Sequence, residues 1–259
     1  MHKNILIVAI VTMLMLSLIA CQPDEDNDPN GDNSVADNGE GITGTYHASS
    51  EADDSGFVLA EVTFEDNEIT DVELEEYTDK GITKGDDYGW EPFHEAMQEL
   101  PDRFVEADSA DIEAYSEATA TSNKAMGAVE KAIQRAEGET EPFDGTFMGI
   151  SEEGEDGWGI TWVTLENDEI QEVQLEEVQV ADEEDNEYEF KDDDYEWEPF
   201  HEAQDEMPER FEEENSHEVD TYSEATESSE LWKDAVQDAL NRAGRENGEE
   251  EEEDDENGE

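Results

Sequence analysis

The chain has 259 residues, of which 80 are aspartate or glutamate and 12 are lysine or arginine, so its formal net charge at pH 7 is −68. This charge argues against nucleic acid and anionic lipid head groups as partners, because both would be repelled. Self-repulsion on this scale is tolerable mainly where salt shortens the Debye length to about 3 Å, near molar ionic strength. The composition therefore indicates a halophilic protein whose carboxylates form a solvated surface.

Residues 1–20 have the pattern of a lipoprotein signal peptide. An apolar run from Ile5 to Leu16 follows Lys3, and small residues precede Cys21, the only cysteine of the chain. A run this short is typical of a processed signal rather than of a membrane span, although an uncleaved anchor is the alternative. We expect cleavage before Cys21 and lipid attachment to its thiol, which would hold the protein on the extracellular face of the cell membrane.

Both ends of the mature chain are predicted to be disordered. Residues 21–41 consist mainly of Asp, Asn, Gly and Pro, and residues 245–259 consist almost wholly of Glu, Asp, Asn and Gly. Segments of this composition cannot bury enough apolar surface to fold. We expect an acidic tether and an acidic tail.

The region between the two ends is duplicated. "EVTFEDNEITDVELEEY" (61–77) recurs as "WVTLENDEIQEVQLEEV" (162–178), and "DDYGWEPFHEA" (86–96) recurs as "DDYEWEPFHEA" (193–203). The offset grows from 101 to 107 residues between these segments, so the second copy holds an insertion of six residues around positions 181–191. The sequence therefore predicts tandem domains at residues 42–138 and 143–244.

Each copy begins with a predicted hairpin. Apolar residues alternate with more polar ones from Val58 to Phe64, as in a half-buried strand, and a second strand follows from Ile69 to Leu74. The loop between them contains Asp66 and Asn67, which tolerate the left-handed conformation that a tight turn needs. The second copy repeats this pattern at Ile170, Val173 and Leu175.

Two helices are predicted after each hairpin. One begins at "WEPF" (90–93 and 197–200), with proline in its first turn. The other carries apolar residues at helical spacing: Ala125, Met126, Val129 and Ile133 in the first copy, and Leu231, Ala235, Val236, Ala239 and Leu240 in the second. Hairpins followed by helices predict an α+β fold, with two tandem copies of a small antiparallel sheet and packed helices.

A Ser/Thr-rich segment precedes the final helix in both copies. It reads "EAYSEATATS" (113–122) and then "DTYSEATESS" (220–229), which places Thr119 and Thr226 within one turn of a helix start. The backbone N–H groups at a helix start are unpaired and carry positive partial charge, so phosphate groups bind there. We expect each threonine hydroxyl to contact a phosphate or to be joined to one.

These segments resemble the FMN-binding domain family of membrane-associated flavoproteins, which includes a peripheral subunit of the sodium-pumping quinone reductase. The openings "GTYHAS" (44–49) and "GTFMGIS" (145–151), the "VTFEDNEITDVEL" hairpin (62–74) and the Ser/Thr-rich segment match the family in order. The last of these resembles the family signature Asp-x-x-Ser-Gly-Ala-Thr. The resemblance covers nearly all of each copy.

The resemblance implies an FMN cofactor joined by a phosphoester bond to Thr119 and Thr226, installed from FAD by a flavin transferase. The other signature residues expected at the cofactor are Ser116, Ala118, Ser223, Ala225 and Asp220. Extracellular lipoproteins with two such domains carry electrons, so the resemblance favours an electron carrier over an enzyme with a substrate of its own. The expected donor is a membrane dehydrogenase or quinol, and the lipid at Cys21 would hold the carrier at the membrane.

Two positions depart from the signature. Glu117 and Glu224 replace its glycine, and Glu113 replaces its leading aspartate in the first copy, whereas Asp220 keeps it in the second. A non-glycine residue in the left-handed region costs roughly 1–2 kcal/mol, so we expect strain if the loop needs that conformation. Either the loop tolerates glutamate, or the protein is a flavin-free envelope lipoprotein that uses the same fold for binding or structure.

Aromatic residues near the first helix of each copy allow two interpretations. Trp90 and Trp197 could stack on a flavin ring, but aromatic residues at helical spacing are more often core, and we predict that they belong to the core with Phe93 and Phe200. His94 and His201 are predicted to be surface residues.

Overall fold

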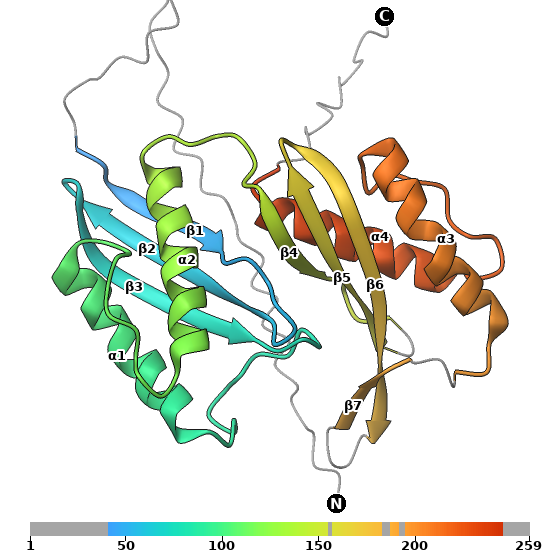
Figure 1. Cartoon of the computed structure of the whole chain (residues 1–259), viewed down its shortest axis with the longest axis horizontal. Coiled ribbons are helices and arrows are strands. Elements are labelled where there is room, and N and C mark those ends of the chain that lie inside the picture. Colours follow the sequence, from blue (N-terminus) through green and yellow to red (C-terminus); the bar gives the residue numbers. More distant parts are fainter. Residues whose placement is uncertain (1–40, 155–156, 183–186, 192–194, 246–259) are drawn as a thin grey trace, which may run out of the picture. The chain divides into compact units, whose positions relative to one another are not determined.

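The computed structural model describes residues 41–245, apart from 155–156, 183–186 and 192–194 (Figure 1). The predicted signal peptide, Cys21 and all but one residue of both the tether and the tail lie outside the described residues. Within them, the chain forms two repeats, each with an antiparallel sheet and two helices, which confirms the predicted α+β class. No helix in this described part is long and apolar enough to cross a bilayer.

The first repeat has three strands followed by two helices. They are β1 (Gly44–Ser49), β2 (Phe57–Glu65), β3 (Glu68–Tyr77), α1 (Glu91–Ala107) and α2 (Thr119–Ala136). The strands lie in the order β1-β2-β3, and every neighbouring pair is antiparallel. Helix α1 packs on β3, and α2 packs on β1 and β2.

The second repeat has the same order of elements with one additional strand. Its elements are β4 (Gly145–Ile150), β5 (Gly157–Glu166), β6 (Glu169–Asp182), β7 (Glu187–Phe190), α3 (Glu198–Glu214) and α4 (Thr226–Arg242). Strand β7 pairs with the extended end of β6, in the region of the predicted insertion. Helix α4 packs on β4 and β5, and α3 packs on β6.

The hairpin turns have the predicted left-handed residues. Asp66 and Asn67 have φ values of 52° and 72°, and Asn167 and Asp168 have φ values of 54° and 61°. The side chain of Asn67 accepts a hydrogen bond from the N–H of Ile42 at 2.8 Å. Short polar side chains tolerate this conformation, which is why the turn was predictable from its residue types.

The prediction for the aromatic residues at the start of α1 and α3 was half wrong. Phe93 and Phe200 are buried as expected, but Trp90 and Trp197 are 43% and 40% exposed. Each tryptophan is the extended residue just before its helix, so it lies off the apolar stripe that contacts the sheet. His94 is not a free surface residue either, because it is half-buried and its Nε2 lies 2.5 Å from the carbonyl oxygen of Tyr88.

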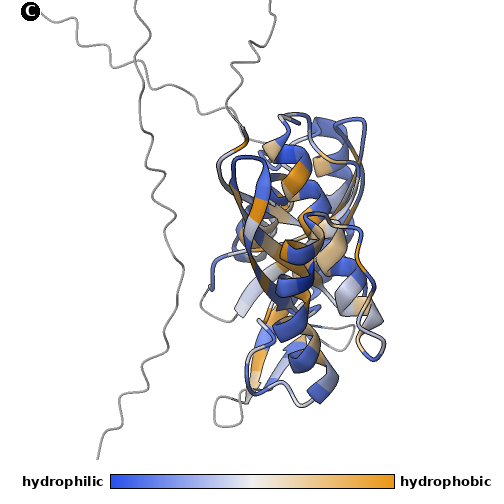
Figure 2. Ribbon diagram, turned by 90° about the vertical axis from the view of Figure 1, so that its left-hand side faces the viewer, coloured by the Kyte–Doolittle hydropathy of each residue, from blue (hydrophilic) through white to orange (hydrophobic). Residues whose placement is uncertain are grey.

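Each repeat has a core between its sheet and its helices. In the first repeat this core includes Val62, Phe64, Leu100 and Val129, and an equivalent core fills the second repeat. Figure 2 shows hydrophilic residues along the helices and loops outside these layers. Neighbouring side chains on a strand point to opposite faces, and only one of the two faces of each sheet packs against the helices.

The helix-free faces of the two sheets form a third core. It joins Phe57 of β2 to Met148, Ile160 and Val178 of the second repeat. Basic residues flank it: the guanidinium carbon of Arg242 lies 4.4 Å from the ring centre of Phe57.

Candidate functional site

Each signature threonine is the first residue of a helix. Thr119 begins α2 and Thr226 begins α4, and both are exposed, whereas Ala118 and Ala225 before them are buried. Among the described residues, no side chain caps either helix start. The first N–H groups of a helix lack carbonyl partners within it, so both starts offer unpaired donors to an anion. The first turn of α2 has no acidic residue, but that of α4 contains Glu227.

A tight turn delivers the chain to each helix start. The N–H of Ala118 donates to the carbonyl of Tyr115 at 3.0 Å, and the N–H of Ala225 donates to that of Tyr222 at the same distance. Glu117 and Glu224 occupy the third position of these turns, and neither has a positive φ. The loop does not need the left-handed conformation at this position, so it tolerates glutamate without strain, which is the first of the two alternatives drawn from the sequence.

A buried serine that the sequence analysis missed ties this turn to the helix. The Oγ of Ser122 donates to the carbonyl of Ala118 at 2.8 Å and accepts from the N–H of Tyr115 at 2.9 Å. Ser229 makes the same two bonds in the second repeat, at 2.7 Å and 3.0 Å. The signal was available in the sequence, since a serine follows each signature threonine by three positions.

An arginine and a tyrosine hold the loop before the turn against the preceding helix. Arg103 of α1 donates to the carbonyl of Glu113 at 2.7 Å, and the hydroxyl of Tyr115 donates to Glu95 at 2.6 Å. The hydrogen bond to the Glu95 carboxylate raises the pKa of Tyr115 to about 12. The loop thus returns along α1, and both helices of the repeat begin at the same end (Figure 1).

The second repeat repeats this arrangement. Arg210 donates to the carbonyl of Asp220 at 2.5 Å, and Tyr222 donates to Glu202 at 2.7 Å. The hydrogen bond to Glu202 raises the pKa of Tyr222. Asp220 therefore contributes its main-chain oxygen to the loop, and its side chain is exposed.

The remaining predicted site residues lie within the same turns. Ser116 and Ser223 are the exposed second residues of the turns that end at Ala118 and Ala225. The structure thus brings the serine, alanine and threonine of each signature together at one helix start, and their contacts with a cofactor stay a prediction.

A cavity of about 460 Å³ lies beside the start of α1 in the first repeat. Its lining includes Leu74, Lys84, Phe93 and Met97. Glu95, which accepts the hydrogen bond from Tyr115, also lines it. The turn that precedes the signature threonine is therefore linked to this cavity through the hydrogen bond between Tyr115 and one wall residue.

A larger groove, of about 990 Å³, lies beside the signature loop of the second repeat. Its lining includes Arg210, His217, Ser223 and Lys233 as well as several carboxylates. Burial lowers the pKa of His217 below its usual value. The groove is polar and carries charges of both signs.

A model of the FMN-binding domain matches residues 55–134 and 157–241, one stretch in each repeat. The chain belongs to the FMN-binding domain family. This flavoprotein has FMN as its cofactor, which confirms the expectation from the signature. No curated protein matches the chain. The crystal structure of the CPE2226 protein from Clostridium perfringens is similar at 25% identity, over 38% of this chain and 92% of that chain, with a TM-score of 0.33.

The start of α2 in this flavoprotein fits the phosphate of FMN. A phosphate needs several donors aimed at one point, and the open first turn of α2 supplies N–H groups with no carboxylate in that turn. The exposed hydroxyl of Thr119 lies at the same place. The described residues therefore provide both a donor set and a hydroxyl for the cofactor.

Proposed function

We propose that the flavoprotein is an extracellular, lipid-anchored electron carrier with FMN joined by a phosphoester to Thr119 and Thr226. The observation that carries this proposal is the position of both threonines, each exposed as the first residue of a helix without a side-chain cap among the described residues. A hydroxyl at that point lies within the donor field that holds a phosphate.

The net charge of −68 favours a covalent link over a dissociable one. A free FMN phosphate carries about two negative charges at pH 7 and is repelled by so acidic a protein. Outside a cell, a released cofactor is also lost by dilution. A phosphoester prevents dissociation and leaves the phosphate with a single charge, which the N–H groups of the helix start stabilise.

The chain's own residues hold the attachment point in one conformation. Ser122 and Ser229 fix the turns to their helices, and Arg103 and Arg210 fix the loops before them. The bound flavin supplies the oxidation and reduction, and the protein supplies position and electrostatics. The anchor at Cys21 would keep the carrier near a membrane dehydrogenase or quinol as donor, and a flavin transferase would attach the FMN.

Detection of flavin on the threonines tests the proposal directly. The full chain is purified from its source organism or co-expressed with a flavin transferase, denatured in detergent and examined for flavin fluorescence in the gel band. Peptide masses then show whether residues 113–122 and 220–229 carry FMN. We expect fluorescence in the wild type, partial loss in Thr119→Val or Thr226→Val, and complete loss in the double variant.

Thr70→Val is the matched control, because Thr70 is an exposed threonine on β3 away from the helix starts. It should retain full fluorescence. A dark wild-type band with unmodified peptides would refute covalent attachment, and a bound flavin that added reductant fails to reduce would refute electron transfer.

A further inference from the structure

Each repeat contains a buried lysine and glutamate at the same place. In the first repeat the Nζ of Lys84 lies 2.6 Å from Glu76, and their side chains are 9% and 2% exposed. Lys191 and Glu177 form the corresponding pair in the second repeat, with side chains 5% and 3% exposed. Two of the 12 basic residues in this acidic chain are thus placed identically inside the protein.

One of the two oxygen atoms of each carboxylate in these pairs accepts no hydrogen bond from the described residues. Within the described part of the chain, the Oε2 atoms of Glu76 and Glu177 are buried and have no hydrogen-bond partner. A buried ion pair contributes little to stability, and a buried acceptor without a donor lowers it. The repetition of this arrangement therefore calls for a ligand that supplies the missing donor.

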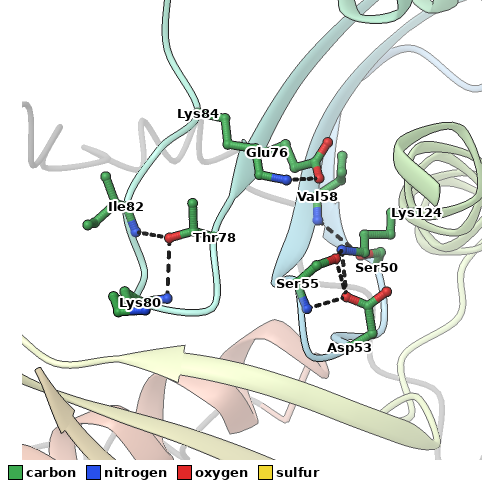
Figure 3. A network of polar contacts seen from close by, with 10 residues as sticks. All are labelled: Ser50, Asp53, Ser55, Val58, Glu76, Thr78, Lys80, Ile82, Lys84 and Lys124. Carbon is green, nitrogen blue, oxygen red and sulfur yellow. Dashed lines mark hydrogen bonds and ion pairs between the residues drawn. The ribbon is translucent and has the colours of Figure 1, made fainter. Parts of the chain in front are cut away.

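One member of the first pair, the lysine, lines the cavity beside the start of α1. Lys84 and Leu74 line this cavity. Glu76 lies two residues after Leu74 on β3, so both side chains point to the helix-covered face. Figure 3 shows Lys84 reaching across to Glu76 at the end of that strand.

The chemistry of this pair is complementary to one edge of a flavin. The pyrimidine edge of the isoalloxazine ring has an N–H donor between two carbonyl acceptors. An ammonium has three donors, of which Glu76 takes one, and the Oε2 of Glu76 is a free acceptor. We propose that Lys84 and Lys191 donate to a ring carbonyl of FMN, and that Glu76 and Glu177 accept the adjacent ring N–H. This inference rests on the proposed attachment of FMN to the threonines.

The pair then sets how readily the flavin is reduced. Reduction adds electron density to the ring, which the ammonium stabilises and the carboxylate opposes. Loss of the lysine should lower the reduction potential, and loss of the carboxylate charge should raise it. Opposite shifts from two neighbours are not expected of a pair that serves stability alone.

The test uses the full chain with Thr226→Val, so that only Thr119 carries flavin, and compares Lys84→Met with Glu76→Gln. We expect Lys84→Met to lower the equilibrium constant for two-electron reduction about tenfold, which is about 30 mV, and Glu76→Gln to raise it. Lys84→Met should also shift a flavin carbonyl stretching band in infrared difference spectra to higher frequency, because a hydrogen bond to that carbonyl is lost. Lys191→Met in a Thr119→Val background tests the second repeat.

Lys124→Met is the matched control. Lys124 is also a buried lysine of the first repeat, 7% exposed and 2.7 Å from Asp53, and it does not line this cavity (Figure 3). It should lower stability and leave the potential unchanged. Equal reduction potentials and equal carbonyl bands in Lys84→Met and Lys124→Met would overturn the inference. If Lys84→Met fails to fold, Lys84→Arg, which keeps the charge, is compared with Lys124→Met in its place. Absence of FMN on Thr119 would instead refute the proposed function.

Discussion

Substitution of Ser122 by alanine removes two hydrogen bonds from a fully buried position. The carbonyl of Ala118 keeps a second partner, the N–H of residue 122 at 2.9 Å, so its loss is partly compensated. The N–H of Tyr115 loses the hydroxyl that accepted from it at 2.9 Å. A buried donor without a partner costs about 1–3 kcal/mol, and we take about 2 kcal/mol for this half-buried residue.

A loss of about 2 kcal/mol should lower the melting temperature by about 4–8 °C in a folded unit of this size. Thermal unfolding of Ser122→Ala at molar salt measures this change, and Ser229→Ala should behave alike because Ser229 makes the same bonds. Ser116→Ala is the control, since Ser116 is exposed in the same turn and its loss should change stability by less than about 0.5 kcal/mol. A shift in Ser122→Ala no larger than in Ser116→Ala would show that the serine does not hold the turn.

Three further predictions concern other parts of the described structure. The phenol of Tyr115 should remain protonated until about pH 12, and Glu95→Gln should move its ultraviolet titration toward its ordinary value near pH 10. Burial acts to raise the pKa of Asp53, but hydrogen bonds from Lys124 and Ser55 outweigh it and hold the pKa below 3.8. The stability that results from this lowered pKa is present above the pKa of the unfolded chain and is lost as the pH falls through the pKa of the folded protein. Urea midpoints measured from pH 6 to 3 should therefore fall less steeply in Lys124→Met, and parallel curves would contradict this. Gly149→Ala should cost about 1–3 kcal/mol in urea unfolding, because its Cβ would lie 1.8 Å from a carbonyl oxygen of α4, whereas an unchanged midpoint would mean that the helix shifts freely.

Features decided by neighbouring residues were predictable from the sequence. The Asp66-Asn67 turn, the start of α1 at "WEP" and the position of Thr119 at a helix start all follow from short-range rules. The duplication added a second observation of each, which strengthened the prediction of two α+β units. The family match then confirmed FMN as the cofactor.

Features decided by distant residues were not predictable. The exposure of Trp90 depends on where α1 meets the sheet, and helical spacing alone could not place the residue just outside the helix. The bond from Ser122 to Tyr115 and the pair formed by Lys84 and Glu76 require the folded loop. The contact between the two sheets was not predictable for a related reason. Phe57 at the start of β2 is buried against the second repeat, whereas the rest of the strand keeps the alternation typical of a strand with one buried face.

The interior position of a few of the lysines gives salt two different effects on this protein. Lys84 and Lys191 form ion pairs in which both side chains are less than a tenth exposed, whereas Lys124, itself 7% exposed, pairs with the exposed Asp53. The guanidinium of Arg242 lies against the ring of Phe57. Mobile ions screen exposed charges strongly and buried pairs much less. Molar salt should therefore relieve the repulsion among the outer carboxylates while leaving the attractions inside almost intact. Removal of salt would restore the repulsion without strengthening those attractions by a comparable amount, so the folded state should gain stability steadily as ionic strength rises.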